Sequence, residues 1–426
     1  MKDARYTAVQ ALLRLTTANA YSNLVVDSLI KQNQLDARDS AFASALFYGT
    51  LERMLTIDHI LKKYSSKPLD KLSPPVLQTL RCGVYQLVYM DGVDDYAAVS
   101  ESVNLVKALG KEKASGFVNG ILRSFLRDNK AIPPVKGSRA DTLAVAYSCP
   151  AWLISVWLEA YGEEASMRML EGSLGKPPIY LRVNTLRVTT DRLLQMLADQ
   201  GVECEADDQT EHCIVVKGRI AVEHLDAFKD GLFHVQDKAS QLCAAALSAQ
   251  PGERVLDVCA APGGKTFTIA QSMQDKGELI ARDLHEKRTS LVRSGARRLD
   301  IGIVKASAGD AGVYDKTLGE FDRILCDVPC SGFGIIRRKP EIKYKTQDSV
   351  QNLPEIQYKI LQTSSQYLKS GGTMVYSTCT LLPRENEQVV ERFLGANQNF
   401  MLVSQQTYTG EQIDTDGFFV SVLKKR

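Results

Sequence analysis

Two cysteines and one acid stand where short apolar runs of the sequence end. FDRILC leads into Asp327 and then Cys330, within DVPCSG, and GGTMVYST ends on Cys379. A thiolate can add to carbon 6 of a pyrimidine, and carbon 5 can then take a methyl group from a sulfonium. The proton left on carbon 5 must be removed before the thiol is expelled, so this chemistry needs a nucleophile, an acid at ring nitrogen 3 and a base. Asp327, Cys330 and Cys379 supply these three groups.

The alternative for each cysteine is a place in the core, where free cysteines are often found. That alternative suits Cys326, which alternates inward in ILCDV, but not Cys330 or Cys379, which have polar or turn-forming neighbours. Lys265 is a further candidate, because a nearby ammonium can lower the pKa of a thiol or orient a base. The spacing alone leaves open which of the two cysteines attacks.

A glycine-rich turn, VLDVCAAPGGKTFTIA, runs from a predicted strand into a predicted helix. Its glycines let backbone N–H groups approach a ligand at the start of that helix. A phosphate-binding P-loop would need a glycine five positions before Gly264, where Cys259 stands. The dinucleotide pattern G-x-G-x-x-G is absent as well, so the turn favours a nucleoside without a phosphate.

Two further acids end the next two predicted strands. Asp283 closes ELIARD and is placed to bind ribose hydroxyls, and Asp310 closes GIVKASAGD and is placed to reach a base edge. The alternative for both is capping of the following helix. Together with the glycine turn, they indicate S-adenosylmethionine as the cofactor.

From about residue 238 the chain alternates between short apolar runs and helix-like segments. The runs include VLDVCAA, ELIARD, DRILCDVP and TMVYSTCT, and FFVSVLKK closes the chain. Such alternation predicts an α/β domain with a mostly parallel sheet covered on both faces. Ligands of such sheets bind outside the carboxyl ends of the strands, where these candidate residues stand.

The preceding parts of the chain have other patterns. Residues 1–135 show helical periodicity throughout, and the Pro- and Gly-containing stretch 130–141 is typical of a linker. Residues 145–236 mix helix-like and strand-like segments and predict a small α+β unit. We expect residues 237–426 to form the catalytic domain.

The bulk composition is that of a globular protein in a reducing compartment. Nine cysteines are scattered along 426 residues that begin without an apolar leader, which favours free thiols and a cytoplasmic location. We find no pattern for a structural metal and no segment suited to cross a membrane. Net charge is +6 for residues 1–140, −7 for 141–240 and +3 for 241–426.

Two basic stretches are candidates for RNA contact. One lies on the helix-like segment GFVNGILRSFLRD, which carries Arg123 and Arg127 on one face, and the other is Arg337, Arg338 and Lys339 after the DVPC motif. Basic residues at the ends of a protein with this charge pattern indicate a polyanion partner. A solvated basic face remains the alternative for both.

Together these motifs resemble a known family. DVCAAPGGKT, DVPCSGFGIIRRKPEIKY and YSTCTLLPRENE are similar to the motifs of RNA cytosine carbon-5 methyltransferases of the NOL/NOP/Sun type. VSESVNLVKALGKEKASGFVNGILRSFLRD resembles the NusB-like domain of the bacterial Sun/Fmu enzymes, which act on 16S ribosomal RNA. The resemblance spans essentially the whole chain. It implies an all-α NusB-like N-terminal domain, a small RRM-like α+β subdomain and a Rossmann-like methyltransferase domain.

The resemblance also implies roles for individual residues. Asp283 would hold the ribose of S-adenosylmethionine, Asp310 the adenine edge, and Asp327 would lie between cofactor and target base. Cys379 would be the nucleophile, and Cys330 would assist product release. The cofactor turn would consist of Cys259, Ala260, Ala261, Pro262, Gly263, Gly264 and Lys265.

The expected partner is therefore 16S ribosomal RNA or an intermediate of small-subunit assembly, bound by a monomer. A DNA cytosine methyltransferase is the enzymatic alternative, but those use the Pro-Cys cysteine as nucleophile and do not need a second one. A non-catalytic assembly factor is the other alternative, and loss of either cysteine or of the glycine turn would have favoured it. The sequence retains all three.

Overall fold

The computed structural model describes residues 3–17, 22–218, 220–410 and 414–426. The chain divides into two compact units, and each is described here by itself. One, the helical unit, comprises residues 1–159 and a separate segment, Lys339–Tyr344. The other, the sheet unit, comprises residues 160–338 and 345–426.

The helical unit is built from amphipathic helices whose starts follow capping signals in the sequence. Asp36 and Asp94 cap α3 and α6, and α5 begins at Pro74 directly after Ser73. Helix α7 buries Val118, as its periodicity predicts. The helices are α1 (Ala4–Thr17), α2 (Ser22–Asn33), α3 (Ala37–Glu52), α4 (Met54–Tyr64), α5 (Pro74–Tyr89), α6 (Asp95–Ala108), α7 (Ser115–Arg127) and α8 (Arg139–Tyr147).

The segment Lys339–Tyr344 belongs to the helical unit although it follows the DVPC motif in sequence. Tyr344 packs against the core formed by α1, α2 and α3, and its hydroxyl donates to the carbonyl of Leu51. Lys343 is fully buried, and its Nζ lies 3.4 Å from the carbonyl oxygen of Glu52. The predicted catalytic region thus contributes a short, partly buried segment to the helical unit.

The sheet unit contains a small antiparallel sheet of order β2-β3-β1-β4. It follows α9 (Ala151–Gly172), which is interrupted at Gly162 by a φ of +78°. This architecture is the small α+β subdomain expected from the sequence. Its elements are β1 (Ile179–Val183), α10 (Thr190–Asp199), β2 (Cys204–Ala206), β3 (Cys213–Val216), α11 (Asp226–Lys229) and β4 (Phe233–Val235).

A seven-stranded sheet of order β10-β11-β9-β8-β5-β6-β7 forms the rest of the sheet unit. Five neighbouring strands are parallel, whereas β11 and β10 run antiparallel at one edge. The sequence analysis did not predict β10, which shows no alternation of apolar and polar residues: Met401, Leu402 and Val403 follow one another and are all exposed. The strands are β5 (Arg254–Asp257), β6 (Glu278–Asp283), β7 (Val304–Ala308), β8 (Phe321–Asp327), β9 (Leu368–Thr378), β10 (Phe400–Tyr408) and β11 (Phe418–Lys425).

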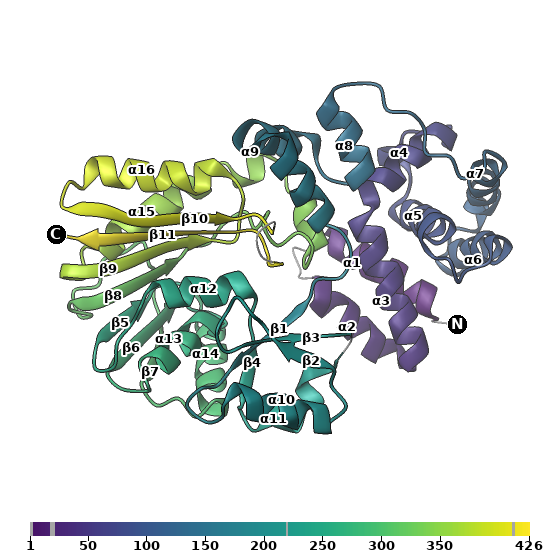
Figure 1. The fold of residues 1–426 in the computed structure, drawn as a ribbon. Helices are drawn as coiled ribbons and strands as arrows, with labels where there is room; N and C mark the ends of the chain where they lie inside the picture. The colour runs from purple at the N-terminus through teal and green to yellow at the C-terminus, as the bar shows by residue number, and fades with distance from the viewer. Residues whose placement is uncertain (1–2, 18–21, 219, 411–413) are drawn as a thin grey trace. The chain divides into compact units, whose positions relative to one another are not determined.

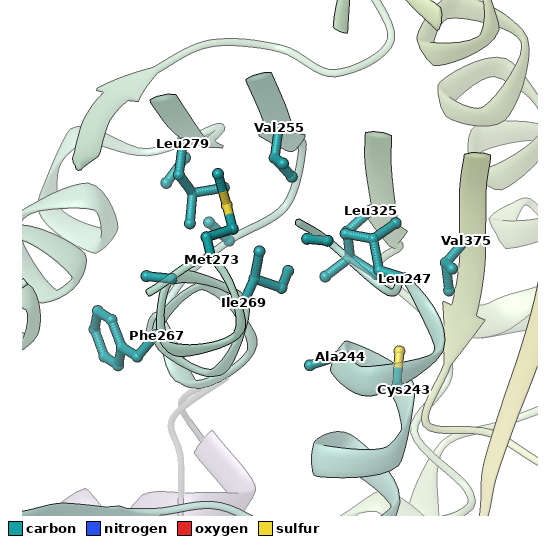
Figure 2. Close-up of a cluster of buried hydrophobic side chains, with 14 of the residues drawn as sticks. Cys243, Ala244, Leu247, Val255, Phe267, Ile269, Met273, Leu279, Leu325 and Val375 are labelled. Carbon is teal, nitrogen blue, oxygen red and sulfur yellow. The ribbon is translucent and has the colours of Figure 1, made fainter. Parts of the chain in front are cut away.

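Helices cover both faces of this sheet, as the strand–helix alternation predicts (Figure 1). One face carries α12 (Lys238–Ala246), α13 (Gly264–Ser272) and α14 (Glu286–Arg298), and the other α15 (Leu353–Ser365) and α16 (Glu387–Ala396). Figure 2 shows Ile269 of α13, together with Met273 and Leu247 at the ends of α13 and α12, against strand residues such as Val255 and Leu325. This packing fixes the start of α13 beside the ends of β5 and β8.

No single described helix is long and apolar enough to cross a membrane, although the bent pair α8 and α9 passes on length and composition. The boundaries expected from the sequence, at residues 135, 145 and 237, remain our proposal for three domains. By compactness alone, the chain divides into two units, and the boundary between them lies inside α9.

Candidate active site

The candidate residues gather at the carboxyl ends of β5, β8 and β9. Asp327 of β8 pairs in register with Ser377 of β9, and Leu325 pairs with Asp257 of β5. The strand order reverses between β5 and β8, because the chain continues from β5 to β6 on one side and reaches β8 on the other. This switch point is where open α/β sheets bind ligands.

Asp327 and Lys265 form a partly buried ion pair at this point. The Nζ of Lys265 lies 2.8 Å from Oδ2 of Asp327, and Ser377 donates to Oδ1 at 2.9 Å. Burial alone would lower the pKa of Lys265, but the charge of Asp327 raises it above its usual range. The ammonium also lies 4.9 Å from the centre of the Phe418 ring. Lys265 is therefore a charged group with a defined position.

The two predicted cysteines are brought together by the loops after β8 and β9. The Sγ atoms of Cys330 and Cys379 are 3.3 Å apart, and both side chains are half-buried. Interaction with Cys379, together with burial, raises the pKa of the Cys330 thiol. Cys326 is fully buried in the core, as its place in the sequence predicts.

The glycine turn starts α13 as predicted. Gly263 has a φ of +115°, and a Cβ added there would lie 2.3 Å from the ring of Phe267, so only glycine fits. Thr266 donates to the buried carboxyl of Asp257 at 2.7 Å. Burial raises the pKa of Asp257 to about 7.

The two predicted cofactor acids differ in exposure. Asp283 is 2% exposed and accepts from the N–H of Ala261 in the glycine turn, at 3.3 Å. It is not the cap of α14, which is His285. Asp310 is exposed, accepts from Gly312 N–H at 2.8 Å, and lines a cavity of about 660 Å³.

These residues fit S-adenosylmethionine by the chemistry of their donors and acceptors. The carboxylate of Asp283 contacts the same turn whose backbone opens α13, so an acceptor for ribose hydroxyls lies beside backbone donors. The acids at Asp283 and Asp310 suit hydroxyl and amino groups better than phosphates. Among the described residues, no cluster of His, Cys, Asp or Glu is arranged to hold a metal.

The predicted RNA-binding residues fall into two settings. Arg123 and Arg127 are exposed on α7 and donate to Asn119 and Ser124 of the same helix. Arg338 instead pairs with two carboxylates of the sheet unit. Its neighbours also have partners, since Arg337 lies 3.3 Å from Asp414, and Lys339, which is half-buried in the helical unit, also has an interaction.

The sequence analysis missed the polar residues that hold the cysteine loops. Glu385 is fully buried and accepts from Ser331 N–H, next to Cys330, at 2.9 Å. Asn386 donates to the carbonyl of Thr380, next to Cys379, at 3.0 Å. The only signal for them was their place in the PRENE stretch after Cys379.

Family models match three parts of the chain. A model described as 16S rRNA methyltransferase RsmB/F matches residues 244–424, the NusB family matches residues 2–127, and a ferredoxin-like domain of RsmF/B-like methyltransferases matches residues 149–223. In solved structures, the chain is similar to PH0851 with a TM-score of 0.85 at 24% identity, over 99% of this chain and 98% of the other. A likeness at this identity supports the fold.

Two relatives are similar over the full length. The probable ribosomal RNA small subunit methyltransferase B of Bacillus subtilis is 38% identical over 445 residues, which covers 100% of this chain and 99% of the relative. The ribosomal RNA small subunit methyltransferase B of Proteus mirabilis is 34% identical, with the same coverage. With both cysteine motifs and the glycine turn in place, the chain belongs to the ribosomal RNA small subunit methyltransferase B family.

Proposed function

We propose that this protein transfers a methyl group from S-adenosylmethionine to carbon 5 of a cytosine in 16S ribosomal RNA. The observation that carries the proposal is the pair of thiols 3.3 Å apart beside the Asp327–Lys265 ion pair. Relatives named for small-subunit ribosomal RNA methylation support the substrate. A solved structure of similar fold, NSun6 from Pyrococcus horikoshii, contains SFG, an analogue of S-adenosylmethionine, which supports the cofactor. We further propose that the protein acts in the cytoplasm as a monomer, on free RNA or on an assembly intermediate.

The first stage is attack on the base. The thiolate of Cys379 forms a bond to carbon 6 of the cytosine, and the electron pair of the 5,6 double bond moves toward carbon 5 as nitrogen 3 takes up a proton. The Cys379 thiol gives up its proton as it attacks, Asp327 passes this proton to nitrogen 3, and Lys265 and Ser377 hold the carboxyl of Asp327 in place. S-adenosylmethionine, when bound, supplies an electrophilic methyl group on a sulfonium.

The second stage releases the product. Cys330, after losing its own proton to solvent, takes the proton from carbon 5 as the double bond re-forms and the bond between carbon 6 and the sulfur of Cys379 breaks. Nitrogen 3 returns its proton to Cys379 through Asp327. The 3.3 Å separation of the sulfur atoms would bring both thiols to the same ring, one at carbon 6 and one near carbon 5. Distance does not distinguish the two cysteines, so the assignment of Cys379 as nucleophile follows the family resemblance.

RNA contact is proposed for both basic stretches. Arg123 and Arg127 would contact phosphates from the helical unit, where they are exposed. Arg337, Arg338 and Lys339 would act near the base, which requires their present partners to share them with RNA.

The experiment that tests this proposal is nucleoside mass spectrometry of small-subunit ribosomal RNA from cells lacking the protein. We expect new 5-methylcytidine after incubation with the protein and S-adenosylmethionine, and none with Cys379→Ala. Cys330→Ala should accumulate an RNA–protein adduct that survives a denaturing gel. Cys204→Ala, which removes a half-buried thiol of β2, is the control and should behave as wild type.

Two outcomes would contradict the proposal. Adduct formation by Cys379→Ala but not by Cys330→Ala would reverse the roles of the cysteines. Absence of 5-methylcytidine on both free RNA and immature small-subunit particles would remove the proposed reaction itself.

A further inference from the structure

The two thiols of the active site have differently charged neighbours. The charge of Cys379 is among the causes that raise the pKa of Lys265, so the ammonium and a Cys379 thiolate attract each other. The carboxylate of Glu385 is among the causes that raise the pKa of Cys330, after the interaction with Cys379 and burial. The nearby positive charge of Lys265 thus favours a Cys379 thiolate, whereas the negative charges of Glu385 and Asp327 disfavour a Cys330 thiolate.

Glu385 is anchored to the loop that carries Cys330. Its Oε2 accepts from Ser331 N–H at 2.9 Å and from the amide of Gln357 at 2.8 Å. The same amide of Gln357 donates to the carbonyl of Pro329 at 3.0 Å. Pro329 and Ser331 flank Cys330, so one buried carboxylate and one amide hold both sides of this cysteine.

The residues around Glu385 also hold the loop that carries Cys379. Tyr376 donates to the carbonyl of Glu385 at 2.6 Å, and the hydroxyls of Ser331 and Thr380 are 2.7 Å apart. Asn386 brackets Cys379 through the carbonyl of Thr380 at 3.0 Å and the hydroxyl of Thr378. The two cysteine loops thus meet on the short stretch Glu385–Asn386.

The hydrogen-bond partners that the structure gives to the Glu385 carboxylate are neutral amides. Its Oε1 is buried without a partner among the described residues, so the negative charge is only partly compensated. Cationic Lys345 is nearby, since it donates to the carbonyl of Ser331 at 2.7 Å. The titratable groups facing Cys330 are Cys379, Glu385, Asp327 and Tyr376.

We propose that Glu385 is a positioning residue that holds Cys330 against Cys379 and keeps Cys330 a thiol while Cys379 attacks. Two sulfur atoms this close do not both ionise readily, because like charges repel. The proposed reaction needs them to act in turn, one as nucleophile and the other later as base. The buried carboxylate of Glu385, anchored on both sides of Cys330, disfavours a charge on that sulfur and so leaves the first ionisation to Cys379. This inference rests on the proposed function, because that reaction needs the two thiols to act in turn. The alkylation test below does not depend on the reaction.

The test is alkylation of Cys330 with iodoacetamide as a function of pH, followed by peptide mass spectrometry of the full-length protein. The Cys379→Ala background removes the coupling between the thiols. In that background, Glu385→Gln should lower the pH midpoint of Cys330 alkylation by about one unit, because a nearby negative charge is removed. Glu387→Gln is the matched control, since Glu387 accepts from Thr407, and should leave the midpoint unchanged.

A second measurement separates the positioning of Cys330 by Glu385 from the effect of the Glu385 charge. Glu385→Ala in the otherwise native protein should lower kcat about 100-fold, because the Cys330 loop loses its anchor, with KM for both substrates nearly unchanged. Glu385→Gln should restore most of kcat, because its amide oxygen can accept both hydrogen bonds, and should shift the pH–rate profile in the direction seen by alkylation. If Glu385→Ala does not fold, the alkylation midpoint of Glu385→Gln alone tests the inference.

An unshifted alkylation midpoint in Glu385→Gln would overturn the inference, as would wild-type kcat in Glu385→Ala. The alkylation measurement needs neither RNA nor methyl transfer. A protein that makes no 5-methylcytidine but shows the shift would therefore contradict the proposed function while leaving the thiol environment established.

Discussion

The two basic stretches proposed for RNA contact differ in what their arginines already bind. On α7, Arg123 and Arg127 are exposed and donate to neutral side chains of their own helix. After the DVPC motif, Arg338 donates to Asp416 at 2.6 Å and to Asp237 at 2.8 Å. Two stretches that are both basic in sequence therefore differ in whether carboxylates of the protein already pair with their arginines.

The partners of Arg338 show what it does for the fold. Asp237 precedes α12, Asp416 precedes β11, and the carbonyl of Pro178, just before β1, accepts a third hydrogen bond at 3.0 Å. Arg338 thus joins three segments of the sheet unit that are distant in sequence. A cation with two carboxylate partners stabilises the protein, whereas one with neutral partners is available to a polyanion.

The largest effect expected from this comparison is on stability. Arg338→Ala leaves two carboxylates facing each other without their cation, and should lower the free energy of unfolding of the sheet unit by about 3 kcal/mol at pH 8. The midpoint of urea denaturation measures it. Lys305→Ala, which removes a cation that is 70% exposed, should leave the midpoint unchanged. A decrease in RNA affinity without a decrease in stability would break the comparison.

The next largest effect is the pH dependence of the stability that Arg338→Ala loses. Burial and the charge of Asp237 raise the pKa of Asp416 to about 7, against the opposing charge of Arg338. A raised carboxyl pKa means that the folded state binds more protons, so this contribution to stability is present below pH 4 and is lost as pH rises through 7. Arg338→Ala removes the opposing charge, so its deficit should be small at pH 5 and grow toward pH 8. Urea titrations at both pH values measure it, and an equal deficit at both would contradict the role assigned to Asp416.

The same contrast separates what the sequence could predict from what it could not. The ends of parallel strands meet at one edge, so placing Asp327, Cys330 and Cys379 at predicted strand ends was enough to bring them together. The partners of Arg338 lie 78 to 160 residues away and follow no local period. Glu385 was missed for the same reason: its hydrogen bonds are to amides of two segments that are distant in sequence.

The third effect concerns RNA affinity. Replacing both Arg123 and Arg127 by alanine should weaken RNA binding about tenfold, and should reduce the slope of log affinity against log salt by about one for each phosphate that is no longer neutralised. Filter binding at several salt concentrations measures it. Lys63→Ala is the control in the same unit, because this lysine already pairs with Asp128 at 2.7 Å, and should change neither quantity. Equal effects of the control and the double variant would make the α7 face an ordinary solvated surface.

The smallest effect is expected at Lys343, the buried cation after the second stretch. Burial lowers the pKa of Lys343, so the folded state holds its proton less tightly than the unfolded state does. The cost of burying this charge is therefore present at neutral pH and disappears as pH rises toward the ordinary lysine pKa. Lys343→Met should raise the free energy of unfolding of the helical unit by about 1 kcal/mol at pH 7, because the buried ammonium donates to a neutral carbonyl over a long 3.4 Å. Thermal unfolding at pH 7 and pH 9.5 measures this gain, which should shrink at the higher pH. The exposed Lys62→Met serves as control, and destabilisation by Lys343→Met would show that the buried ammonium contributes more through its hydrogen bond than it costs in hydration.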